Sequence, residues 1–195
     1  MAIYMDYGYI AVYSSGPNTA IAAMKTEVQK HLEYASGYLD LKMYDDAVRE
    51  ADAALALQPD EPQAITIKSA ALWQANRLKE AEPCVAKLAE LNPRNPGLWI
   101  NLAYIRRRTH SLDAAVETLQ HALEADPRDA LAHFNMACYR AMQQRTPEAL
   151  ELLRNALHLD PKLKSLARAE PDLTSLRGLP EFQDLVNRKD QTPGS

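Results

Sequence analysis

The sequence predicts an all-α protein, an α-solenoid of about four helix-turn-helix units closed by capping helices at its C-terminal end. Two observations carry this prediction. A proline recurs every 34 residues through most of the 195-residue chain, and small residues recur in step with it. Between the prolines, apolar residues follow the spacing of an amphipathic helix, as at Leu112, Val116 and Leu119.

Residues 1–24 precede the first unit, and we expect them to be extended or disordered. Within them, residues 3–13 (IYMDYGYIAVY) are rich in aromatic and β-branched side chains, which favour an extended chain. A lone strand, however, has no sheet to join in an all-α protein. The stretch lacks the basic region and clear cleavage site of a secretory signal. It can also be an artefact of an upstream start, with Met24 as the natural beginning.

Four units follow within residues 25–163, and each ends just after one of the periodic prolines. The units are 28–61, 62–95, 96–129 and 130–163, with Pro59, Pro93, Pro127 and Pro161. An alanine precedes each proline by twelve residues: Ala47, Ala81, Ala115 and Ala149. A small residue precedes it by twenty-four: Ala35, Ser69, Ala103 and Ala137. Small side chains let two helix axes approach closely, so we expect two antiparallel helices in each unit. The proline begins the turn to the next unit, because it lacks an N–H and disfavours helix in the residue before it.

This pattern resembles the tetratricopeptide repeat (TPR) family over about residues 28–163. Trp99, Leu102 and Ala103 match the opening signature of that family, and the period, the small positions and the prolines agree with it. The resemblance implies a right-handed solenoid in which the first helices of successive units line the inner, concave surface.

Five residues depart from the family's pattern. Lys68 stands where an aliphatic residue is usual, and Arg106 and Arg140 replace the usual aromatic residue of the first helix. His31 and His133 hold its bulky opening position. We interpret all five as variations in packing.

Residues 164–188 are predicted to form capping helices, divided by Pro171 and Pro180, and this ending resembles that of many bacterial TPR arrays. A solenoid needs such a cap because its last unit otherwise leaves an apolar face exposed. The residues expected to cover that face are Leu166, Leu173, Leu176, Phe182 and Leu185. We expect residues 189–195 to form a disordered tail.

Composition and motifs argue against several classes of function. The net charge of -4 and the pI near 5.7 disfavour a nucleic-acid-binding protein, which usually has a basic excess. No stretch approaches the length of an apolar membrane span. Cys84 and Cys138 lack metal-ligand spacing and suggest a reducing compartment, so a cytoplasmic protein is expected. Because no histidine lies in a catalytic or zinc motif and no phosphate-binding loop occurs, we expect neither enzyme activity nor a metal or cofactor.

The concave surface implied by the resemblance carries apolar and basic side chains where a solvated surface should be polar. A contiguous apolar patch usually marks a binding surface, and aromatic residues beside arginine are typical of binding hot spots. The predicted peptide-binding residues are Leu39, Trp73, Ile100, Tyr104, Arg107, Arg108, Phe134 and Met142. The alternative is that these side chains pack only against one another, since adjacent first helices touch.

We therefore predict a non-enzymatic protein-interaction module that binds a peptide segment with apolar and acidic side chains in its concave groove. A self-assembling scaffold and a chaperone for a secreted or assembling protein are the alternatives. Residues 3–13 can take part in either kind of interaction. They can pair with another chain, or they can lie along the groove of the same chain or of a neighbouring one. In the groove, their tyrosines would lie against Trp73 and Phe134, and Asp6 near Arg107 or Arg108.

Overall fold

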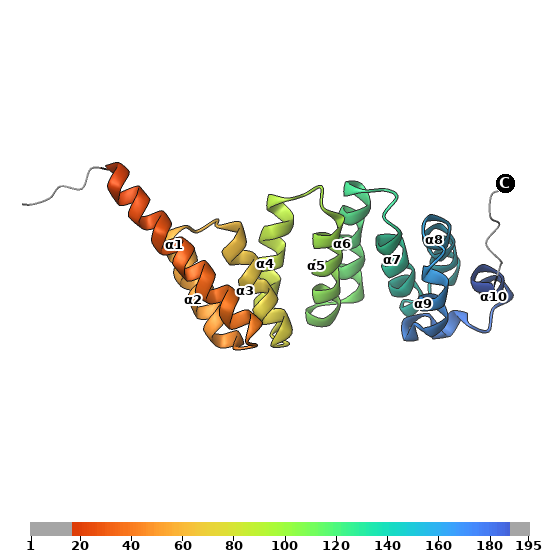
Figure 1. The fold of residues 1–195 in the computed structure, drawn as a ribbon. Coiled ribbons are helices and arrows are strands. Elements are labelled where there is room, and N and C mark those ends of the chain that lie inside the picture. The colour runs from red at the N-terminus through yellow and green to blue at the C-terminus, as the bar shows by residue number, and fades with distance from the viewer. Residues whose placement is uncertain (1–16, 188–195) are drawn as a thin grey trace, which may run out of the picture.

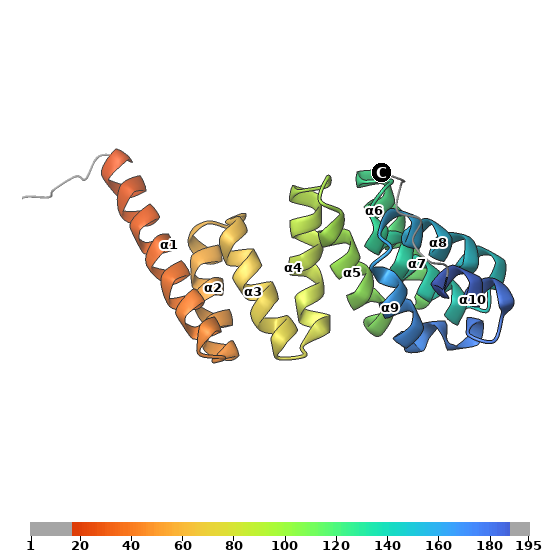
Figure 2. The same cartoon turned by 45° about the vertical axis from the view of Figure 1, so that its right-hand side comes forward.

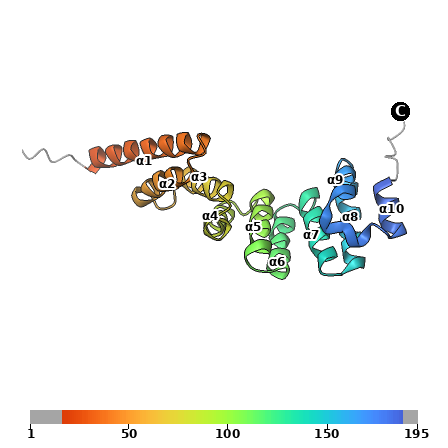
Figure 3. The same ribbon diagram turned by 90° about the horizontal axis from the view of Figure 1, so that it is seen from below.

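The computed structural model describes residues 17–187, and every regular element in that range is a helix (Figure 1). The helices pair in sequence: α1 (Pro17–Asp40) with α2 (Tyr44–Leu57), α3 (Pro62–Gln74) with α4 (Leu78–Leu91), α5 (Pro96–Thr109) with α6 (Leu112–Ala125), and α7 (Ala130–Met142) with α8 (Thr146–Leu159). The first helices α1, α3 and α5 follow one side of the array, and their partners α2, α4 and α6 follow the other (Figure 3). The predicted all-α solenoid of helix-turn-helix units is confirmed. None of the helices between residues 17 and 187 is long and apolar enough to cross a membrane.

The periodic small residues lie where the helices of a unit meet. Ala47, Ala81, Ala115 and Ala149 are all completely buried. Ala35, Ala103 and Ala137 are completely buried as well, and Ser69, the polar residue at the same place in the second unit, is also buried and donates its hydroxyl to the carbonyl of Thr66. Close approach of the helix axes is therefore the reason that these positions are small.

A capping residue stands two positions after each of three periodic prolines and fixes where the next first helix begins. Glu61, Asn95 and Asp129 each accept a hydrogen bond from a backbone N–H in the first turn of α3, α5 and α7. Proline follows the cap in α3 and α5, where its missing N–H costs nothing. The 34-residue period thus sets the helix starts as well as the packing.

The first helix begins earlier than predicted. Residues 17–24 were expected to be extended or disordered, but they form the start of α1. Proline at the first position and three alanines, Ala20, Ala22 and Ala23, favour helix here. Residues 1–16, including the tyrosine-rich stretch 3–13, lie outside the described residues.

The C-terminal cap consists of α9 (Leu163–Ala169), the 3-10 helix η1 (Pro171–Leu176) and α10 (Pro180–Asn187). These segments lie against the last helix pair (Figure 2). Helix η1 packs on α7, while α10 contacts α8 and α9. Leu173, Leu176 and Phe182 are buried as predicted, whereas Leu166 is 44% exposed and does not cover the end of the array. Residues 188–195, which include the predicted tail, are not among those described.

Candidate peptide-binding site

A pocket of about 510 Å³ lies between the second and third units. Residues of α3 form one wall: Pro62, Thr66, Ser69, Ala70, Trp73 and Gln74. The start of α5 and the turn before it form the other: Asn92, Asn95, Leu98 and Asn101. Val85 and Leu88 of α4 complete the lining, and both are nearly buried. The lining combines an apolar base with neutral amides and hydroxyls, a composition suited to a peptide's side chains and backbone.

An aromatic pair bridges α3 and α5 beside this pocket. The rings of Trp73 and Tyr104 are stacked, with centroids 5.0 Å apart and planes 29° from parallel. Tyr104 is still 37% exposed. The guanidinium carbon of Arg108 lies 5.7 Å from the centroid of the Tyr104 ring, and its Nη1 donates a hydrogen bond of 3.2 Å to the tyrosine Oη. Three of the predicted site residues are therefore brought together at one place.

The three consecutive arginines of α5 have different partners. Arg106 pairs with Glu82 at 3.3 Å, and both guanidinium ends of Arg107 contact Asp172. Arg108 forms no ion pair with any residue between 17 and 187, and its guanidinium interacts with Tyr104 as described above. Its exposed guanidinium is thus available to a carboxylate from outside the array.

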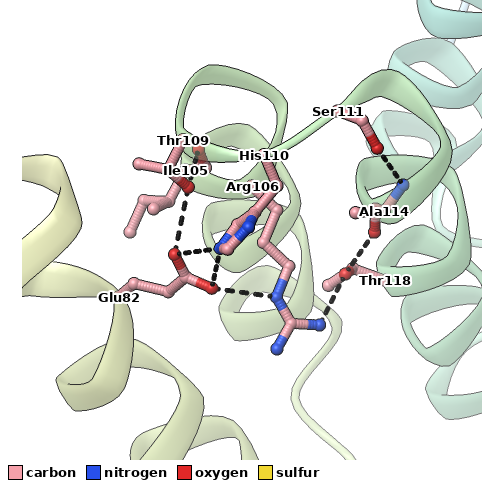
Figure 4. Close-up of polar contacts among 8 residues, drawn as sticks. All are labelled: Glu82, Ile105, Arg106, Thr109, His110, Ser111, Ala114 and Thr118. Carbon is pink, nitrogen blue, oxygen red and sulfur yellow. Dashed lines mark hydrogen bonds and ion pairs between the residues drawn. The ribbon is translucent and has the colours of Figure 1, made fainter.

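Glu82 of α4 joins the second unit to the third through α5 (Figure 4). Its carboxylate accepts hydrogen bonds from Thr109 Oγ1 at 3.0 Å, His110 Nε2 at 2.9 Å and Arg106 Nε at 3.3 Å. Arg106 also donates to Thr118 of α6 at 3.0 Å. Burial alone would raise the pKa of the Glu82 carboxyl, but hydrogen bonds from Thr109, His110 and Arg106 outweigh it, so the pKa lies below its ordinary value.

The residues that depart from the family's pattern have partners within the array. Lys68 pairs with Asp52 at 2.6 Å, and Arg140 pairs with Glu148 at 3.3 Å. His31 lies 2.7 Å from Glu50. These contacts fit the interpretation of the departures as variations in packing.

The fourth-unit histidine reproduces a contact made by a tryptophan in the third. The ring of His133 donates from Nε2 to the carbonyl of Pro127 at 3.0 Å, just as Trp99 Nε1 donates to the carbonyl of Pro93, 34 residues earlier. This contact fits the interpretation of His133 as a variation in packing.

Two predicted site residues, Phe134 and Arg107, are covered by the C-terminal cap, contrary to their predicted place in an open groove. Phe134 is 3% exposed and lies in the same core cluster as Leu173 and Leu176 of the cap. Arg107 holds Asp172 and lies 5.4 Å from the centroid of the buried Tyr139 ring, where burial raises the pKa of the phenol to about 12. These positions do not face an open groove, because η1 occupies the face of α7.

The remaining predicted residues lie apart from the pocket lining. Leu39 and Ile100 are partly buried and pack against the core, while Met142 is exposed. Asn92 and Asn95 line the pocket but were not predicted, because the predicted site included only the faces of the first helices. The sequence feature that could have indicated them is their position on either side of the periodic Pro93.

Comparison with known proteins agrees with this architecture. A family model described as "Psidin, N-terminal TPR repeats region" matches residues 31–153. A search of curated proteins finds no match.

Three solved structures illustrate the likeness in fold. A crystal structure of MamA protein has a TM-score of 0.69 at 14% identity, covering 82% of this chain and 86% of its own. MamA residues 41 to the end from Desulfovibrio magneticus RS-1 gives 0.62 at 18% identity, covering 74% and 87%. YrrB, described as "a TPR protein with an unusual peptide-binding site", gives 0.61 at 19% identity, covering 86% and 91%.

Proposed function

Because the chain belongs to the tetratricopeptide repeat family and has that family's protein-interaction fold, we propose that it is a non-enzymatic module that binds a peptide in the pocket between α3 and α5. The observation that carries the proposal is the Trp73–Tyr104 pair beside this pocket, with Arg108 next to it, which forms no ion pair with another described residue. Aromatic side chains with an adjacent arginine are the most frequent hot-spot residues of protein interfaces.

The lining indicates the chemistry of the peptide. Val85, Leu88 and Leu98 offer apolar contacts to an inserted side chain, and Trp73 offers a ring to stack on. Arg108 adds a positive charge at the aromatic edge, so an acidic residue close to the apolar one completes the match. We therefore propose a ligand that carries both an apolar or aromatic side chain and a carboxylate.

The pocket limits how much of the peptide is recognised. Its volume of about 510 Å³ lies within the range of pockets that hold small ligands. Towards the C-terminal end, η1 already lies on α7, so the recognised segment does not continue along the fourth unit. A short motif of a few residues, rather than a long helix, is the expected ligand.

A second candidate is a self-assembling scaffold, in which residues 3–13 of a neighbouring copy are the ligand. The tyrosines and Asp6 of that stretch have the apolar, aromatic and acidic character that the pocket and Arg108 favour. A chaperone for a secreted or assembling protein would use the same pocket.

The two free cysteines, Cys84 and Cys138, support a cytoplasmic location.

The test is selection of a displayed random-peptide library on the full chain, followed by calorimetric titration of a selected peptide. We expect the selected peptides to share an apolar and an acidic residue, and Trp73→Ala or Arg108→Glu to weaken binding at least about tenfold. Met142→Ala is the matched control, because Met142 is exposed on a first helix but lies outside the pocket. Equal binding to the wild-type, Trp73 and Arg108 proteins would place the site elsewhere.

Self-assembly gives a different result. If residues 3–13 of a neighbour are the ligand, sedimentation shows association that rises with concentration, and Trp73→Ala abolishes it. A chain that stays monomeric and binds the selected peptide supports capture of a foreign peptide instead.

A further inference from the structure

The outer side of α1 carries apolar side chains that no residue between 17 and 187 buries. Helix α1 is the outermost described helix at its end of the array (Figure 1). Tyr34 and Leu41, two turns apart on this side, are 51% and 70% exposed. Met43, in the turn that follows the helix, is 43% exposed. We call this surface, formed by Tyr34, Gly37, Leu41 and Met43, the α1 outer face.

The repeat shows what the same face does in a later unit. Two periods further along, Leu102 and Ile105 of α5 are buried in one core cluster with Val85 of α4. Thr109 of α5 donates a hydrogen bond of 3.0 Å to Glu82 of α4. These three residues of α5 stand at the helix positions of the α1 outer face. The face is therefore the one that a first helix packs against a neighbouring helix.

The chemistry of this face differs between the first and second units. In the second unit it meets the acidic α2 through charges, since Lys68 pairs with Asp52 at 2.6 Å. Arg77 likewise pairs with Asp45 at 2.7 Å. At the same two repeat positions the α1 outer face carries an aromatic and a thioether side chain. It is therefore suited to an apolar partner rather than to an acidic helix.

Gly37 lies at the centre of the α1 outer face, between Tyr34 and Leu41. A glycine inside a helix is about 1 kcal/mol less favourable than alanine. A Cβ atom placed at Gly37 would have no contact within 4 Å among the described residues, so none of them requires the glycine. The known use of a glycine at such a place is to let another backbone approach closely.

We propose that the α1 outer face binds the same face of a second copy of the chain, so that two arrays form a dimer joined at their N-terminal ends. The two α1 helices would cross in antiparallel direction around a twofold axis at Gly37. In such an interface one surface serves both partners, so it must be complementary to itself.

The α1 outer face meets this condition. In antiparallel helices that cross at Gly37, residues that face each other have numbers that sum to about 75. Tyr34 then packs on Leu41 of the second copy, and the axis repeats this contact. By the same rule, Glu33 lies opposite Lys42 of the second copy. Neither of these two forms an ion pair with another residue between 17 and 187, so the opposite charges favour the pairing.

The other end of the array does not offer a competing partner. Both α9 and α10 contact the last second helix, α8. Phe182 and Val186 of α10 are buried in the same core cluster as Leu153 of α8. The α1 outer face of another copy therefore has no open second helix to pack on, which disfavours a head-to-tail chain. A closed dimer is the assembly that remains for two copies.

The size of the face sets the expected affinity. It extends over about three helical turns, so it buries less than the roughly 800 Å² per partner of a standard interface. We expect a dissociation constant of about 10–100 µM. The proposal is independent of the peptide pocket, because the α1 outer face lies on α1 and does not involve Trp73 or Arg108.

Sedimentation equilibrium of the full chain, at concentrations up to about 300 µM, tests the proposal. We expect the wild type to form dimers and Gly37→Leu to weaken association at least about tenfold, because its side chain holds the two helices apart. Leucine favours helix over glycine and has space in the monomer, so the melting temperature should not fall. Tyr34→Ser should weaken association as well. Gln29→Leu is the control, since Gln29 is exposed on another side of α1.

Cross-linking tests the position of the twofold axis. Under mild oxidation, Gly37→Cys should form a disulfide between two copies, because a residue on the axis faces its own counterpart. Gln29→Cys has the same native cysteines, Cys84 and Cys138, and should give no more dimer than the wild type.

Four results would overturn the proposal. The first is a wild type that stays monomeric at every concentration, and the second is equal association of wild type and Gly37→Leu. The third is growth beyond the dimer. The fourth is loss of association in Trp73→Ala, which would assign it to the peptide pocket. A dimer that persists in Trp73→Ala and is lost in Gly37→Leu supports the proposal and leaves the pocket open to a foreign peptide.

Discussion

Removing the charge of Arg107 should loosen the C-terminal cap. The contact joins α5 to η1 across 65 residues of sequence, with Nη1 2.5 Å from Asp172 Oδ2 and Nη2 3.0 Å from Oδ1. The two side chains are only 28% and 17% exposed. The guanidinium also lies near the ring of Tyr139, so three segments meet at this ion pair.

Because the pair is only partly exposed, the stability lost in Arg107→Met should lie between the values typical of exposed and buried ion pairs. An exposed ion pair contributes about 0–1 kcal/mol, while breaking a buried one costs about 3–5 kcal/mol. The pair is bidentate and mostly shielded, so we expect a loss of about 2–3 kcal/mol in the free energy of unfolding. Most of that loss comes from leaving the Asp172 carboxylate without its partner.

A double-mutant cycle isolates the interaction. Urea unfolding of the wild type, Arg107→Met, Asp172→Asn and the double variant gives the coupling energy, which we expect to be about 1–2 kcal/mol. A coupling below about 0.5 kcal/mol would refute the view that this pair holds the cap. Until this is measured, charge reversal at Arg107 is not a clean test of ligand binding, because it also perturbs the fold.

Three further predictions concern the array itself. Ala115→Leu should lower the free energy of unfolding by about 1–3 kcal/mol, because Ala115 is completely buried between helices. The control Glu117→Leu, on the exposed face of α6, should change it little. Equal urea midpoints for the two variants would contradict the repeat register. Gln144 has a φ of 61°, a backbone conformation that glycine adopts without strain, so Gln144→Gly should stabilise the protein by about 0.5–1 kcal/mol. The control Gln120→Gly, within α6, should destabilise it by about 1 kcal/mol. A loss of stability in both variants would show that the backbone of Gln144 is not strained. The pKa of Glu82 is lowered in the folded state, so its ionised form contributes stability that is present above the unfolded pKa of about 4.3 and is lost as pH falls through the folded pKa. Urea unfolding at several pH values should therefore show the difference between wild type and Glu82→Gln narrowing below about pH 5, and a constant difference would exclude this role.

The repeat architecture could be predicted from the sequence because its cause is local and periodic. A small residue such as Ala115 recurs where two helices touch, and a proline such as Pro127 recurs where the chain turns. The same helix contacts recur in each unit, so four copies of one residue pattern support the prediction. The place of Trp73, Tyr104 and Arg108 on one face of the first helices could also be predicted, because it follows from helical spacing, but the stacking of the two rings was not predicted.

The location of the cap could not be predicted in this way. The pattern placed Phe134 and Arg107 on the concave face, but it contained no information about which segment lies on that face. Asp172 reaches Arg107 because η1 packs on α7, and the described residues contain one such contact. A single long-range contact has no repeat to reveal it. The early start of α1 was missed because residues 17–24 fall outside the period.

The position of the pocket follows from how the second and third units are joined. Helix α3 has more contact with α1 than it has with α5, whereas α4 packs closely on α5. The link between these units therefore runs mainly through α4, where Glu82 receives hydrogen bonds from three residues at the end of α5. On the first-helix side, the large Trp73 and Tyr104 rings span the gap, while small residues such as Ala70 leave space beside them. Because one network sets the distance between α4 and α5, Glu82→Gln should alter peptide affinity as well as stability, although Glu82 does not line the pocket.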